Sequence, residues 1–146
     1  MLSESRLRHD LQTAMKARDM RRVYVLRGVL AAVANAKIEK SGAEPSAAEI
    51  VAIVQREAKK RDEAEAFARA GNRAELADQN AAERALLAEY LPRPLDDAEL
   101  GNLVRSWIAE GVNGLGPLMA RLKERHAGEY DGKHASEIVR RILTSG

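Results

Sequence analysis

Two prolines one residue apart, Pro92 and Pro94, divide the sequence into two helical regions. Each proline ring fixes φ, removes a backbone N–H donor and disfavours helical geometry in the residue before it. A helix that approaches Pro92 must therefore end there. A new helix can begin soon afterwards, because Asp96 and Glu99 form a capping pair in the pattern D-x-x-E. The sequence therefore predicts two domains, residues 1–93 and residues 94–146.

Apolar residues recur at helical spacing on both sides of these prolines, and no stretch alternates as a strand would. Alanine, leucine, glutamate and arginine dominate the 146 residues, which is typical of helices. We therefore predict an all-α protein, with an N-terminal four-helix region and a C-terminal three-helix bundle around Trp107. The third helix is expected from about Ala47 to Ala70, after a capping box at Ser46, and the fourth from Glu75 to Leu91.

The third helix carries mixed charges between Glu57 and Glu63. At i, i+3 and i, i+4 spacing such a run is typical of a solvated, salt-bridged face, so we do not expect Asp62 and Glu63 to act as a catalytic pair. Towards its end the helix keeps only Ala64, Phe67 and Ala68 as an apolar stripe. This half is expected to project or to meet a partner. In the fourth helix, Leu76 is expected to face inward.

Several classes of site are excluded by the residues present. The chain has no cysteine, so it can form no disulfide and no thiolate site. Its three histidines, His9, His126 and His134, lack metal-ligand spacing and are expected on the solvated surface. No phosphate-loop or nucleophile-elbow motif occurs, so we expect no catalytic residue, cofactor or metal. With no leader-like start and no apolar run of about 20 residues, we expect a cytoplasmic protein with no membrane partner.

The basic side chains give the remaining functional signal. Residues 1–40 hold nine Lys/Arg against four Asp/Glu, whereas residues 95–146 hold seven against eight. Arg121 and Arg125 are expected on one helix face, opposite the stripe of Leu118 and Leu122, with Lys133 beyond the following loop. Clusters of this kind can bind phosphates. We therefore predict nucleic-acid contact by two clusters: Arg18, Arg21 and Arg22, and Arg121, Arg125 and Lys133.

The chain also resembles a known family over nearly its whole length, the GatB/YqeY family in its stand-alone YqeY-like form. The resemblance rests on the order and spacing of four segments: Leu7 to Lys40, Glu63-Ala64-Glu65-Ala66-Phe67 followed by Ala70-Gly71, Glu89-Tyr90-Leu91-Pro92, and Asp131-Gly132-Lys133. It implies a helical domain joined to a three-helix tail.

The resemblance also implies an association with tRNA amidation. Related tails end the B subunit of the glutamine-dependent amidotransferase that converts Glu-tRNA to Gln-tRNA, where they contact tRNA, and similar modules are appended to some glutaminyl-tRNA synthetases. Glu129 and Pro117 depart from the family, because basic residues are common at both positions. We therefore expect a tRNA-binding or adaptor module, whose partner, an amidotransferase or synthetase, would supply any carbon–nitrogen ligase activity. One alternative is a protein–protein scaffold that uses the long third helix, and another is an amidotransferase-linked enzyme component whose site is not recognisable in the sequence.

Overall fold

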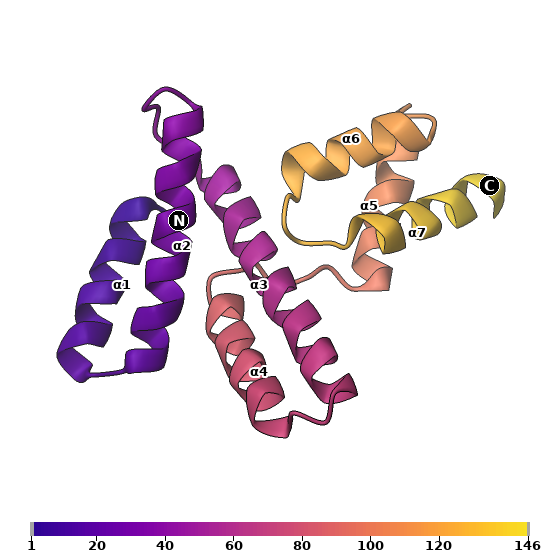
Figure 1. Cartoon of the computed structure of the whole chain (residues 1–146). Helices are drawn as coiled ribbons and strands as arrows, with labels where there is room; N and C mark the ends of the chain where they lie inside the picture. The colour runs from indigo at the N-terminus through magenta and orange to yellow at the C-terminus, as the bar shows by residue number, and fades with distance from the viewer. Residues whose placement is uncertain (1, 146) are drawn as a thin grey trace. The chain divides into compact units, whose positions relative to one another are not determined.

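The computed structural model describes residues 2–145, which are all-α as predicted (Figure 1). No helix among them is long and apolar enough to cross a membrane. Four helices precede the two prolines and three follow them. The helices are α1 (Glu4–Ala17), α2 (Met20–Glu39), α3 (Ala47–Ala70), α4 (Ala74–Ala88), α5 (Asp97–Ala109), α6 (Leu115–Arg125) and α7 (Gly132–Ser145).

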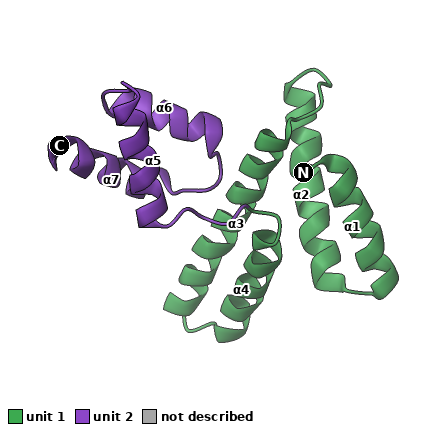
Figure 2. Cartoon of the chain, turned by 180° about the vertical axis from the view of Figure 1, so that it is seen from behind, with its two compact units in different colours: residues 1–91 green, residues 92–146 purple. Residues whose placement is uncertain are grey.

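The contacts within the chain divide it between Leu91 and Pro92 into two compact units (Figure 2). Unit 1 holds α1 to α4, and unit 2 holds α5 to α7. Each unit buries its own apolar cluster. The prediction of two domains, 1–93 and 94–146, also requires that each part folds independently, and this stays a prediction.

Local signals set most helix ends in unit 1. Ser3 accepts a hydrogen bond from the backbone N–H of Arg6 and caps α1. The chain then reverses at Arg18, whose φ of 57° lies in the left-handed region, and Asp19 caps α2. Ser46 and Glu49 form the expected capping box at the start of α3. The apolar core of the unit includes Leu7, Leu26, Val29, Val33, Ile50, Val54 and Leu87.

The two residues that follow α4, Glu89 and Tyr90, contact the first two helices. The Tyr90 hydroxyl donates a hydrogen bond of 2.5 Å to Asp10 on α1, and the Arg6 guanidinium lies 5.3 Å from the Tyr90 ring centroid. Burial, followed by the bond to Asp10, raises the pKa of Tyr90 well above its ordinary value. Arg22 on α2 donates to Glu89 at 2.8 Å. Unit 1 is therefore closed by polar contacts immediately before the prolines.

A buried ion cluster joins α3 to α4. Arg61 donates to Glu57 on its own helix at 3.2 Å and to Glu83 on α4 at 3.3 Å, while Gln79 donates to the second oxygen of Glu83 at 3.2 Å. Glu57 and Glu83 are 9% and 5% exposed. The expectation that the run from Glu57 to Glu63 is a solvated face is therefore wrong for Glu57 and Arg61, because α4 covers them.

Two apolar residues of the same helix pair lie outside the core. Phe67 is 84% exposed, and Leu76 is 37% exposed. The expectation that Leu76 faces inward is therefore wrong. Small residues occupy the buried positions of this interface instead, among them Ala68 of α3 and Ala77 of α4, which are 2% and 0% exposed. Their short side chains let the two helices approach closely.

Unit 2 packs three short helices around Trp107, which is 3% exposed. Asp96 accepts a hydrogen bond from the Glu99 N–H and caps α5, and Asp131 accepts one from the His134 N–H at the start of α7. Pro117 lies in the first turn of α6, where a missing N–H donor is tolerated. The core residues around the indole are Leu100, Val104, Leu118, Leu122, Ala135, Ile138 and Val139.

We expect Arg61→Met to lower the unfolding free energy of unit 1 by about 3–5 kcal/mol, since it leaves the buried Glu83 without a cation and leaves Glu57 only the exposed Lys60. Arg69→Met is the matched control on the same helix. Arg69 pairs with Glu65 and Asp78, but its side chain is 51% exposed, so its loss should lower the unfolding free energy much less than the loss of Arg61. Urea unfolding followed by circular dichroism measures both. Equal, small losses in the two variants would contradict a structural role for the cluster.

Limited digestion with a protease of broad specificity tests the domain prediction. The first cuts are expected between Pro92 and Asp96, which join two separately packed cores outside any helix. The products, identified by mass spectrometry, should each keep a helical circular dichroism spectrum. Early cleavage inside α5, with the proline segment protected, would rule out two independent domains.

Candidate nucleic-acid interface

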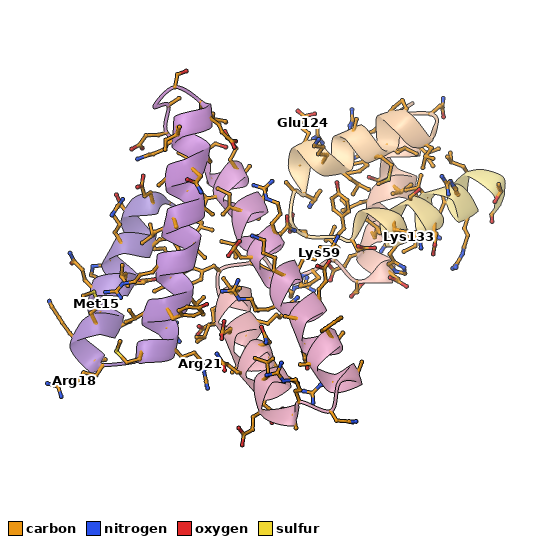
Figure 3. The ribbon with its side chains drawn as sticks, in the orientation of Figure 1. Met15, Arg18, Arg21, Lys59, Glu124 and Lys133 are labelled. Carbon is orange, nitrogen blue, oxygen red and sulfur yellow. The ribbon has the colours of Figure 1, made fainter. Side chains whose placement is uncertain are left out.

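The first predicted cluster lies at the turn between α1 and α2. Arg18 ends α1, and Arg21 belongs to the first turn of α2. Both are exposed, and Figure 3 shows the two side chains pointing away from each other at this turn. No carboxylate of residues 2–145 forms an ion pair with either of them. Both guanidinium groups are therefore accessible to a large anionic partner, at two separate points.

Arg22, the third member of this cluster, is engaged within the protein. Its guanidinium lies 3.3 Å from Asp19 and 2.8 Å from Glu89, and its side chain is 29% exposed. The hydrogen bond to Glu89 raises the pKa of Arg22 above its ordinary value. Arg22 holds α2 against the end of α4, so a phosphate would have to compete with two carboxylates for it.

Arg121, in the second predicted cluster, is also engaged. It donates to Glu110 at 3.0 Å, and its guanidinium lies 5.7 Å from the centroid of the Trp107 ring. The expectation that Arg121 lies opposite the stripe of Leu118 and Leu122 is therefore wrong. A residue three positions after Leu118 lies beside it on the helix surface, which brings Arg121 to the edge of the buried face.

Arg125 and Lys133 are the exposed members of this cluster. Arg125 ends α6 and Lys133 lies in the first turn of α7, so they flank the loop of residues 126–131. Figure 3 shows Lys133 at the beginning of α7. Neither forms an ion pair with the described part of the chain. The structure thus brings these two cations to the ends of one loop.

The loop between them carries acids as well as bases. Glu129 lies 2.9 Å from Nδ1 of His126, whose ring centroid is 6.2 Å from that of Trp107. His126 is therefore half-buried, and the expectation of a solvated surface residue is wrong for it. Within residues 2–145, no three His, Asp or Glu side chains gather as metal ligands would. Arg125 and Lys133 are thus the exposed cations at the two ends of this loop.

The sequence pattern did not single out two further arginines of unit 2, Arg105 on α5 and Arg141 on α7. They line one open pocket together, although 36 residues separate them. Arg105 is an isolated basic residue and Arg141 adjoins only one other arginine, so neither stood out as part of a cluster. Only the packing of α5 against α7 brings them together.

A pH-dependent charge lies next to Lys133. Nε2 of His134 is 2.7 Å from Asp97, and this hydrogen bond raises the pKa of His134 above its ordinary value of about 6.5. The stabilisation from this pair is present below pH about 6.5 and is lost as the pH rises through the folded-state pKa. NMR titration should show a midpoint above 6.5 that Asp97→Asn lowers, while Glu137→Gln changes it less. An unchanged midpoint in Asp97→Asn would contradict the pairing.

A comparison with curated proteins found no match. A family model described as "Yqey-like protein" matches residues 4–143, which covers both units and all seven described helices except the last residues of α7. The chain therefore belongs to the YqeY-like protein family.

Proposed function

We propose that this protein binds tRNA as a non-catalytic adaptor in glutamine-dependent tRNA amidation. The observation that carries the proposal is the pair of exposed cations, Arg125 and Lys133, at the two ends of the loop of residues 126–131. Phosphate contacts from lysine and arginine supply most of the sequence-independent affinity of proteins for nucleic acids. The accessible Arg18 and Arg21 of unit 1 can add to these contacts.

The binding is weak under this proposal. Arg22 and Arg121 are occupied by carboxylates of the protein itself, which leaves four of the six predicted cations accessible. Two to four phosphate contacts correspond to a log–log salt slope of about −2 to −4. Acidic neighbours such as Glu129 and Asp131 lower the local potential further. A module of this kind would need a larger partner to hold tRNA firmly.

That partner, in the proposal, is a tRNA amidotransferase or an aminoacyl-tRNA synthetase in the cytoplasm. The support is the resemblance to the tails that end the B subunit of the amidotransferase. Glutamine hydrolysis, carboxylate activation and carbon–nitrogen bond formation would all take place on the partner. The role of this protein would be to position the tRNA through its backbone phosphates.

A second candidate function is a protein–protein scaffold, and one specific observation favours it. Phe67 is 84% exposed near the end of α3, where it borders an open depression together with Ala64 and Leu76. A large exposed aromatic residue beside other apolar atoms is typical of a protein contact. Under this alternative, Phe67→Ala would abolish the capture of a partner protein from an RNase-treated lysate and leave the fold intact.

The tRNA proposal is tested by measuring tRNA binding across a salt series. Arg125→Ala/Lys133→Ala should weaken binding and make the slope shallower by about 2, since each lost phosphate contact lowers it by about 1. Arg56→Ala/Lys59→Ala is the matched control, because it removes two exposed cations of α3. The control should keep a slope near that of the wild type.

Two results would overturn the tRNA proposal. One is the absence of tRNA binding by the wild-type protein even at low salt, which would favour the scaffold. The other is an equal change in slope for the two double variants, because it would show only a response to net charge. Arg121 is left unchanged in this test, because its contact with Trp107 supports the fold of unit 2.

A further inference from the structure

An open pocket of about 590 Å³ lies in unit 2 between α5 and the end of α7. Its volume falls within the range of roughly 300–1,000 Å³ found for small-molecule sites. Two arginines, an asparagine, a serine and three aliphatic side chains line it. These residues are Arg105, Ile108, Asn113, Arg141, Ile142, Leu143 and Ser145.

The charged side chains that line this pocket are all positive. No carboxylate side chain lines it, and no carboxylate of residues 2–145 forms an ion pair with Arg105 or Arg141. Unit 2 as a whole is balanced, with eight Lys/Arg and eight Asp/Glu between residues 92 and 146. Arg93 and Arg121, by contrast, are paired with Glu99 and Glu110. The positive charge of the pocket is therefore local.

The guanidinium group of Arg105 lies beside a glycine of the same helix. A Cβ atom at Gly101 would lie 3.1 Å from Nη1 of Arg105, which is closer than ordinary van der Waals contact. Glycine within a helix costs about 0.5–1 kcal/mol relative to alanine, so its presence in α5 calls for a physical reason. The room that it leaves for the guanidinium is such a reason. Gly101 lets Arg105 fold back along α5.

We propose that this pocket binds one nucleotide of the tRNA, a site that rests on the tRNA-binding function proposed above. The guanidinium groups of Arg105 and Arg141 present planar forks of N–H donors, which match the oxygens of a phosphate group. Ile108 and Ile142 provide an apolar surface for the base or ribose, and the Asn113 amide can donate to or accept from a base edge. An unpaired nucleotide of a tRNA loop has this combination of charge and flat apolar surface.

The site is tested with Arg105→Ala/Arg141→Ala and the matched control Lys123→Ala/Arg140→Ala. Both remove two exposed cations from unit 2, but only the first pair lines the pocket. The pocket variant should lose about tenfold to a hundredfold in tRNA affinity at 50 mM salt, with a slope shallower by about 1.4–1.8. The control should lose much less. Arg105→Lys/Arg141→Lys should keep the salt slope of the wild type but lose part of its tRNA affinity, because lysine carries the charge without the planar fork of N–H donors.

NMR gives a second readout that does not depend on the variants' affinities. On addition of tRNA, the Nε–H signals of Arg105 and Arg141 should shift more than that of Arg121. Thermal unfolding of each variant shows whether it has kept its fold. If the alanine variant is destabilised, the lysine variant and the NMR shifts of the wild-type protein test the proposal in its place.

Each outcome separates the pocket from the general function. If the wild-type protein binds tRNA and the pocket variant loses no more affinity for tRNA than the control variant, the pocket proposal is wrong and the tRNA-binding proposal stands. If the wild-type protein does not bind tRNA, the pocket proposal and the tRNA-binding proposal are both wrong. Capture of an acidic, apolar peptide by Arg105 and Arg141, without any effect of these residues on tRNA binding, would assign the pocket to a protein partner instead.

Discussion

One guanidinium group, that of Arg61, is shared by two buried carboxylates where α3 packs on α4. Breaking a buried ion cluster is costly, because it leaves a carboxylate without its cation, so the cluster fixes how the two helices meet. Small buried residues on the same two helices, Ala68 and Ala77, bury little area. Because the cluster helps to position α4, it also helps to position Glu89 and Tyr90 directly after that helix, which contact α2 and α1.

The segments that carry the family resemblance are explained largely by these contacts. Within Glu89-Tyr90-Leu91-Pro92, Glu89 accepts from Arg22 and Tyr90 donates to Asp10, and both partners belong to the first of the four segments. Asp131 caps α7. These residues hold the fold together through contacts within the chain. The membership of the family therefore says more about how this chain folds than about what its surface binds.

The surface proposed to bind RNA depends on which basic side chains the fold pairs with carboxylates and which it leaves exposed. Arg22 and Arg121 looked equivalent to their neighbours in sequence, but each is held by a carboxylate of a different helix or loop. Arg125 and Lys133 are left exposed at one loop, and Arg105 and Arg141 meet at a pocket. A near-neutral unit can therefore present local positive charge, which net charge alone does not reveal.

The sequence by itself determined the helical class, the break at Pro92, and most helix ends, because caps, prolines and apolar periodicity act over a few neighbouring residues. Ser46 and Asp96 both cap the helices for which their spacing marked them. Only the tertiary structure decided that Glu57 and Arg61 are buried, that Leu76 is not, and that Arg105 lies with Arg141. Each of these depends on a partner helix distant in sequence, and a charged side chain on an amphipathic helix gives no local sign of what will cover it or pair with it.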